Sequence, residues 1–210
     1  VRYIDIQKQF EHRTITINGF SNGIRRFCFG FAKKVLIANT VAKAADKIFA
    51  LPPEQIDFAT AWLGAVCYTL QIYFDFSGYS DMAIGLAALF GFKYKENFNY
   101  PYISKTVGEF WRRWHITLGS WFRDYLFYPV MRSGWCSSLG KRLKEKFGKK
   151  LSGKVTTVIA LMCVWFFTGM WHGASWHYII WGVYYGILII LSTLLSPVFD
   201  GFVQKHSIDR

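Results

Sequence analysis

Long blocks of apolar residues alternate with short polar stretches along this chain of 210 residues. Four apolar blocks cover residues 58–74, 82–92, 155–167 and 178–195. These blocks are expected to be membrane spans or near-spans, because about 20 apolar residues cross a bilayer. Between residues 21 and 50, apolar side chains recur every three or four positions beside basic residues, which predicts a helix lying at the membrane surface. The pattern predicts an all-α, polytopic membrane domain that occupies residues 1–210 as a single unit.

Three polar stretches predict loops, namely residues 1–17, 93–102 and 132–154. The last holds eight Lys or Arg residues and one acidic residue, a composition typical of the cytoplasmic side of a membrane. The following helix would then begin at the cytoplasmic face near Val155. His172 would lie about 25 Å further along, in the outer half of a hydrocarbon core about 30 Å thick. Ser196 and Pro197 are expected to end the last span.

A helix is predicted over residues 107–128, where Trp111, His115 and Leu118 share one face. Thr106 and Glu109 have the spacing of a capping box at its start. The helix is too charged to span a membrane simply. Two interpretations stay open: an interfacial helix whose arginines contact lipid headgroups, or a helix that turns His115 toward a cavity.

The amino-acid composition favours some classes of function over others. Hydrophobic residues make up 52% and the net charge is +12. The basic residues cluster next to apolar runs, which favours contact with membrane lipids over nucleic acid. The four cysteines include no C-x-x-C pair, and His172 and His177 have the wrong spacing for one helix face, so no metal site is expected. The chain also lacks the common zinc-protease, nucleotide-binding and serine-hydrolase motifs.

Two carboxylates, Asp75 and Asp81, stand between two of the apolar blocks. If this stretch is a loop outside the bilayer, both are solvated. If the helix breaks or re-enters the membrane, both line a polar cavity, because irregular backbone at membrane depth occurs only there or within protein. The short second block favours the cavity.

His172 joins two apolar blocks, with Gly169 and Gly173 on either side. Burying a polar group without a partner costs several kcal/mol, so a histidine at this depth is a candidate for function. Neutral imidazole suits acyl transfer to a hydroxyl, because it takes the hydroxyl proton and returns it to the leaving thiolate. His115 is the second candidate. The alternative is that these histidines make ordinary interhelical hydrogen bonds.

Four motifs follow one another along the chain: GFAKKVLIA at residues 30–38, YFDFSGYSDMA at 73–83, FWRRWHITL at 110–118 and MWHG at 170–173. With them the chain resembles the membrane-bound O-acyltransferases, in the branch typified by alginate O-acetyltransferase. The resemblance implies a partial fold in which membrane, re-entrant and interfacial helices surround a central tunnel. It makes His172 and His115 the catalytic candidates. The candidates for substrate or tunnel contacts are Trp171, Gly173, Asp75, Ser77, Tyr79, Asp81, Trp111 and Arg113.

The resemblance also implies a reaction. An acetyl group would pass from cytosolic acetyl-CoA, a substrate and not a bound cofactor, to a hydroxyl of an exported polysaccharide with the help of an extracytoplasmic acetyltransferase partner. The protein would be a multi-pass component of the bacterial inner membrane. Family members are longer, so helices at both ends are expected to be missing here. His177 stands where a small polar residue or Asn is expected, and Gly119 where serine is frequent.

Two alternatives stay open. A related family member would transfer D-alanine from a carrier protein to teichoic acid. In a proton-coupled transporter, His172, Asp75 and Asp81 would instead relay protons.

Overall fold

The computed structural model describes the backbone of residues 2–206 and the side chains in that range apart from Thr193 and residues 196–206. Every regular element in the described part is helical, which confirms the all-α class. The chain divides into two compact units, Val1–Phe98 and Asn99–Arg210. The single domain predicted over residues 1–210 stays a prediction.

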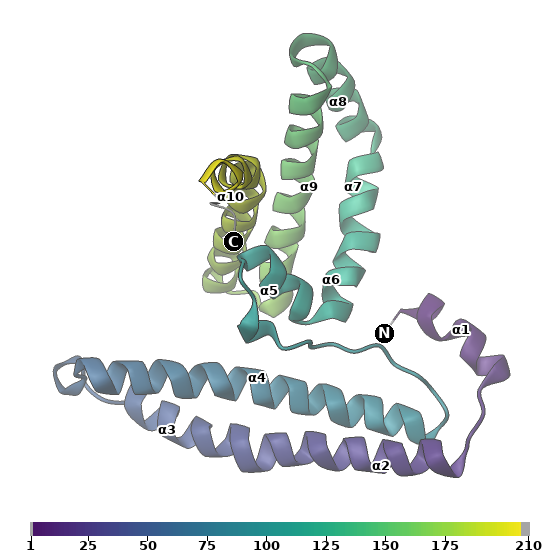
Figure 1. Cartoon of the computed structure of the whole chain (residues 1–210), viewed down its shortest axis with the longest axis vertical. Coiled ribbons are helices and arrows are strands. Elements are labelled where there is room, and N and C mark those ends of the chain that lie inside the picture. Colours follow the sequence, from purple (N-terminus) through teal and green to yellow (C-terminus); the bar gives the residue numbers. More distant parts are fainter. Residues whose placement is uncertain (1, 207–210) are drawn as a thin grey trace. The chain divides into compact units, whose positions relative to one another are not determined.

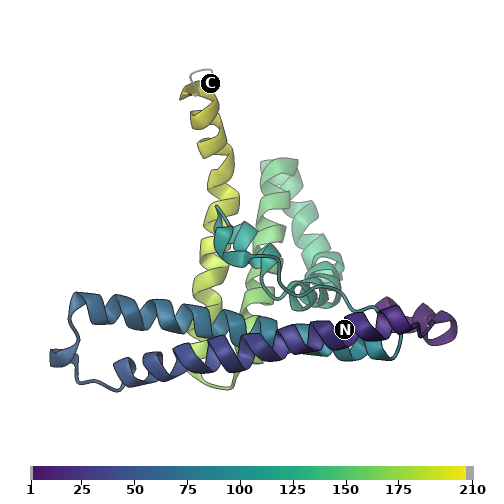
Figure 2. The same cartoon turned by 60° about the horizontal axis from the view of Figure 1, so that its bottom comes forward.

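The first unit is an antiparallel helical hairpin preceded by a short helix (Figures 1 and 2). Its elements are α1 (Tyr3–His12), α2 (Ile17–Ala32), the π-helix η1 (Lys33–Ala38), α3 (Asn39–Phe49), the 3₁₀ turn η2 (Pro53–Gln55) and α4 (Phe58–Leu89). The stretch α2–η1–α3 runs without a break beside α4, so the helix predicted over residues 21–50 is confirmed and begins earlier. The loop predicted over residues 1–17 was wrong, because α1 occupies most of it.

Small residues bring the backbones of α2 and α4 into contact. A Cβ added to Gly30 would lie 2.5 Å from the carbonyl oxygen of Gly78, and one added to Gly85 would lie 2.7 Å from that of Gly23. Helices in membranes associate closely where small side chains meet in this way. These four glycines therefore set the spacing of the hairpin.

The helix α4 is continuous through the stretch that contains Asp75 and Asp81, so both the loop and the break or re-entrant turn considered there were wrong. The reason is the partner helix. Lys33 and Lys34, on η1, approach the two carboxylates, and Ser77 and Gly78 are buried between them. A polar stretch that finds its partners on a neighbouring helix keeps its own backbone hydrogen bonds.

The second unit starts with the 3₁₀ turn η3 (Pro101–Ile103) and contains seven further elements: α5 (Val107–Arg113), α6 (Ile116–Phe122), the π-helix η4 (Arg123–Phe127), α7 (Tyr128–Arg132), α8 (Gly134–Phe147), α9 (Lys149–His172) and α10 (Trp176–His206). The loop predicted over residues 93–102 is confirmed up to η3. The backbone of α10 continues past Ser196 and Pro197, so the predicted end of this helix was wrong.

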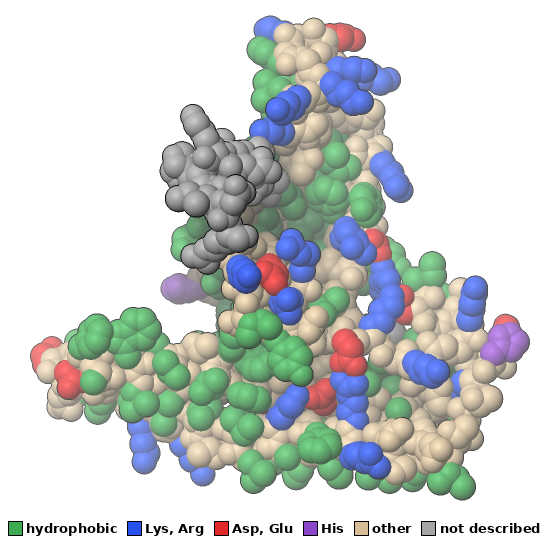
Figure 3. Space-filling view, in the orientation of Figure 1, with side chains coloured by type: hydrophobic (Ala, Val, Ile, Leu, Met, Phe, Trp, Pro, Cys, Tyr) green, Lys and Arg blue, Asp and Glu red, His purple; other side chains and the backbone are tan. Residues whose placement is uncertain are grey.

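The basic stretch over residues 132–154 is a helical hairpin and not the predicted loop. Ser133 caps α8 by accepting a hydrogen bond from the backbone N–H of Cys136. The chain turns into α9 at Gly148, whose φ of 85° lies in the left-handed region. The Ser152 hydroxyl donates to the carbonyl oxygen of Gly140 at 2.7 Å and ties the two helices together. Figure 3 shows the Lys and Arg side chains gathered at this end of the hairpin.

The single helix predicted over residues 107–128 was also wrong, because it breaks at His115. This residue has φ 47° and ψ 51°, a left-handed conformation that α5 cannot continue. Its carbonyl oxygen then accepts a hydrogen bond from the N–H of Gly119 and begins α6. Trp111 and His115 consequently do not share the face of one helix.

Within the described residues, one helix, α9, is long and apolar enough to cross a membrane. The segment Trp176–Ser192 of α10 is apolar but shorter. The polytopic arrangement stays a prediction.

Candidate active site

His172 is the last residue of α9, where the chain turns toward α10. Its ring centroid lies 4.8 Å from that of Trp171, 4.8 Å from that of Trp181 and 6.2 Å from that of Tyr178. Gly173, with φ 157°, ends the helix. A Cβ on Gly173 would lie 2.7 Å from the Tyr178 ring, so the lack of a side chain here lets that ring approach the backbone closely.

His115 joins the same group from the break between α5 and α6. Its ring centroid lies 5.7 Å from that of Trp171, which itself contacts His172. The three residues form what we call the histidine row: His115, Trp171 and His172. Burial, followed by the positive charge that His172 carries when protonated, lowers the pKa of His115 from 6.5 to about 4. At neutral pH the His115 imidazole is therefore uncharged.

An aromatic cluster extends the histidine row. Trp111 lies 4.8 Å from Trp165, 5.2 Å from Tyr185 and 5.9 Å from Trp181, between ring centroids. Trp181 also contacts His172. The Trp111 indole nitrogen is buried and finds no hydrogen-bond partner within the described residues. Of the predicted substrate contacts, Trp111, Trp171 and Gly173 thus lie in or next to the row.

Arg113 has a different setting. Its guanidinium donates to the Glu109 carboxylate at 2.9 Å and to the carbonyl oxygen of Asn99 at 3.1 Å. Glu109 also accepts a hydrogen bond from the N–H of Lys105, which with Arg113 lowers the pKa of Glu109. The Thr106 hydroxyl caps α5 as predicted, whereas Glu109 reaches Lys105 and not the cap residue. These bonds fasten the turn that leads into α5.

The remaining four candidates lie on α4 in the first unit. Asp81 accepts hydrogen bonds from Arg26 at 2.8 Å and from Lys33 at 2.5 Å, and Asp75 pairs with Lys34. The Ser77 hydroxyl is buried without a hydrogen-bond partner in the described part of the chain, and Tyr79 is exposed. Asp75 and Asp81 are therefore engaged by basic side chains of α2 and η1. That they contact substrate or line a tunnel stays a prediction.

The predictions from the sequence did not include an aromatic pocket beside the histidine row. This pocket of about 340 Å³ is lined by Trp121, Phe122, Tyr125, Leu126, Phe167, Met170 and Trp171. The predictions from the sequence also did not include Tyr178, Trp181 and Tyr185 as neighbours of the site. The signal was available, because these three recur at three and four positions on the helix that follows His172. The described residues contain no group of three or more His, Cys, Asp or Glu side chains placed to hold a metal ion.

The fold and site define a class: an all-α protein with an apolar helix of membrane-spanning length that ends on a histidine, and a second histidine nearby. The profile of MBOAT, the membrane-bound O-acyltransferase family, matches residues 1–208. The chain belongs to this family, and is a membrane protein on that ground.

Known relatives refine the comparison. The chain is 46% identical to the probable alginate O-acetylase AlgI of Pseudomonas aeruginosa over 196 residues, which are 93% of this chain and 34% of that protein. It is 36% identical to the peptidoglycan O-acetyltransferase of Helicobacter pylori over 90% of this chain and 33% of that protein. It is 37% identical to the teichoic acid D-alanyltransferase of Bacillus subtilis over 58% of this chain and 28% of that protein. The chain thus spans about a third of the length of the relatives that it matches.

Proposed function

We propose that this chain forms the histidine-bearing part of a membrane O-acyltransferase, which moves an acetyl group from acetyl-CoA to a hydroxyl of an exported polysaccharide of the alginate type. The observation that carries the proposal is the histidine row, in which His115 and His172 both contact Trp171. The similarity to AlgI over most of the chain supports the acetyl group and the acceptor class.

The chemistry needs one general base. Neutral His172 accepts the proton of the acceptor hydroxyl while its oxygen attacks the carbonyl carbon of the acetyl thioester. The tetrahedral intermediate then collapses, the carbon–sulfur bond breaks and the proton passes from the imidazolium to the leaving thiolate. An ester and free CoA result, so atoms and charges balance. General base catalysis of this kind contributes about 10²- to 10⁴-fold to a rate.

His115 is suited to a second role at the same site. Its low pKa keeps the ring neutral, so it contacts Trp171 beside His172 without placing a second positive charge there.

The direction of transfer is supported by α9. This helix begins with basic residues and ends at His172 after 24 residues, which is about 36 Å of helix. Lys and Arg are enriched on the cytoplasmic side of membrane helices, so the basic end would face the acetyl-CoA pool. The multi-pass location in the bacterial inner membrane and the extracytoplasmic partner are part of this proposal.

The test is the acetyl content of the exported polymer in cells that carry the full-length protein. His172→Ala should lower it by at least about 100-fold while the protein accumulates in the membrane at its normal level. His115→Ala should also lower it. His12→Ala is the matched control, because His12 is exposed at the end of α1. Normal acetylation by His172→Ala would remove this residue from the reaction.

D-alanyl transfer is the second candidate, favoured by the similarity to teichoic acid D-alanyltransferases. The same general base chemistry would serve D-alanyl transfer, so the identity of the acyl donor distinguishes the two candidates. If acetyl-CoA is the donor, the purified protein reconstituted in membranes should release CoA from radiolabelled acetyl-CoA and label the polymer. Labelling only from a D-alanyl carrier protein would replace the acetyl proposal with this alternative.

A further inference from the structure

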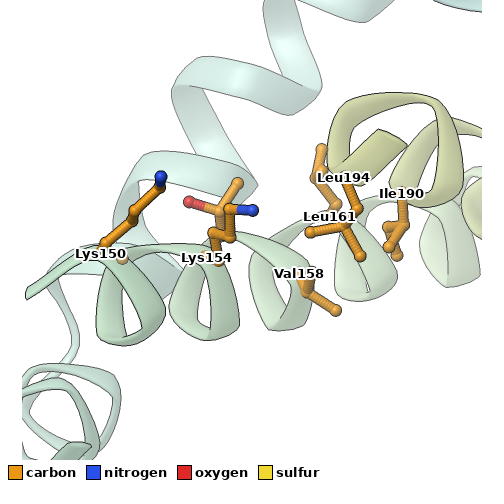
Figure 4. A pocket seen from close by; sticks show the side chains of 8 residues that line it. Lys150, Lys154, Val158, Leu161, Ile190 and Leu194 are labelled. Carbon is orange, nitrogen blue, oxygen red and sulfur yellow. The ribbon is translucent and has the colours of Figure 1, made fainter. Parts of the chain in front are cut away.

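A groove of about 310 Å³ lies between α9 and α10, at the opposite end of α9 from His172 (Figure 4). Lys150 and Lys154 stand at one end, and Leu161, Ile190 and Leu194 at the other. The acyl-transfer chemistry proposed above does not use this groove.

The lining is amphipathic along its length. Two ammonium groups are followed by Thr157 and then by aliphatic side chains, of which Val158 and Leu161 come from α9. From Lys150 to Leu161 the helix rises about 16 Å, close to the depth of one leaflet of the hydrocarbon core. Within the described residues no carboxylate pairs with either lysine. A ligand that fits has an anionic head and an apolar chain.

The expected depth of the groove in a membrane indicates which ligand with an anionic head and an apolar chain would bind there. The helix α9 is the described helix that can span a bilayer, and basic residues crowd its first turns and the preceding α8. Basic side chains at the end of a span lie at the level of the lipid headgroups. The aliphatic end of the groove then lies at the level of the acyl chains.

We propose that this groove binds one anionic phospholipid, with its phosphodiester between Lys150 and Lys154 and an acyl chain along Val158, Leu161 and Leu194. The lysines contribute positive charge and the aliphatic side chains contribute apolar contact. A lipid bound in the groove uses both, whereas nonspecific attraction of anionic lipids to the basic helical hairpin uses charge alone. Lipid binding in this groove does not depend on acyl transfer, and the two are tested separately.

Gly153 supplies a way to block the groove. It lines the groove, and a Cβ added to it meets nothing within 4 Å. Gly153→Leu should therefore fill lipid space without disturbing the packing of α9. Gly153→Ala is its matched control, because a methyl group leaves most of the groove free.

The experiment uses the full-length protein in nanodiscs of phosphatidylcholine that contain a small share of photoactivatable phosphatidylglycerol. Crosslinks should map to peptides of α9 and α10 that include Val158 or Ile190. Lys150→Gln with Lys154→Gln should lower this labelling about 30-fold, since each basic residue near the surface contributes about five- to sixfold. Gly153→Leu should lower it comparably, and Gly153→Ala should keep it.

The charge control is Lys141→Gln with Lys144→Gln, which removes the same charge from exposed positions of α8 outside the groove. Equal losses in the two double variants would show general attraction to the hairpin and overturn the proposal. Equal labelling by photoactivatable phosphatidylcholine would overturn it too. Displacement by excess pyrophosphate in the buffer would assign the lysines to a soluble phosphate compound instead of a lipid. Retention of labelling under pyrophosphate supports the lipid.

Discussion

The imidazole of His115 and the indole of Trp171 lie 5.7 Å apart between ring centroids and are inclined by 60°. His172 follows Trp171 directly and contacts it at 4.8 Å. One indole thus lies against both histidines, although 57 positions separate them in the chain. In the proposed reaction Trp171 is a positioning residue, because it acts through the orientation of the two imidazoles.

This relationship predicts a graded response at residue 171. Trp171→Ala should reduce acetyl transfer by about tenfold or more, because a misplaced catalytic group loses much of its advantage. Trp171→Phe keeps an aromatic contact and should retain a larger share of the rate. Acetyl transfer by the full-length protein is measured at saturating and limiting donor, and the loss should fall mainly on kcat. Equal activity of both variants would exclude a positioning role.

The pKa of His115 predicts a dependence of stability on pH. In the folded protein the pKa of His115 is about 4, below the 6.5 of an unburied histidine. The unfolded chain therefore takes up this proton first as the pH falls. The contribution of His115 to stability is unchanged above about pH 7 and declines as the pH falls from about 6.5 toward 4.

The check compares thermal unfolding in detergent at about pH 7 and about pH 5. His115→Gln removes the titrating group, so its unfolding temperature should fall less than that of the parent protein over this interval. The same fall in both proteins would show that His115 is not held neutral by burial.

The sequence predicted those parts of the molecule that depend on neighbouring residues. Apolar periodicity predicts the helix over residues 21–50. The hydroxyl of Thr106 predicts the cap of α5, and Gly173 marks the end of the helix that carries His172. The family motifs supplied the catalytic candidates, and the structure brings His115 and His172 to one indole.

What it missed depends on partners far along the chain. The continuity of α4 through Asp75 and Asp81 depends on basic residues 41 to 55 positions earlier, which no local pattern reveals. The left-handed backbone of His115 lies within a run of residues that all tolerate a helix. Charge alone predicts a loop for the basic stretch after residue 132, although Ser133 and Gly148 mark the two ends of α8.

The two carboxylates of α4, Asp81 and Asp75, should contribute differently to the stability of the folded protein. Asp81 is 16% exposed and binds both Arg26 and Lys33, whereas Asp75 is 50% exposed and pairs with Lys34. Asp81→Asn should destabilise the protein by about 1–3 kcal/mol, and Asp75→Asn by about 0–1 kcal/mol. The comparison is made by thermal unfolding, with acetyl transfer measured per folded molecule. A large loss of transfer per folded Asp81→Asn molecule would instead place this carboxylate in the reaction.

Two glycines at the contact between α9 and α10 allow the close packing of these helices to be tested. A Cβ on Gly169 would lie 2.5 Å from the carbonyl oxygen of Tyr178, and one on Gly182 would lie 2.4 Å from that of Trp165. Backbone atoms cannot move aside as flexible side chains can. Gly169→Ala and Gly182→Ala should therefore each cost about 1–3 kcal/mol of stability.

Gly153→Ala is the control for these two variants, because it is also a glycine in α9 but has open space around it. Alanine is the better helix former by about 1 kcal/mol, so this variant should match or exceed the parent protein in unfolding temperature. Separating α9 from α10 also moves Trp181 away from His172, so Gly169→Ala and Gly182→Ala should lower acetyl transfer together with stability. Unaltered unfolding of Gly169→Ala would contradict the close contact of the two helices beside the histidine row.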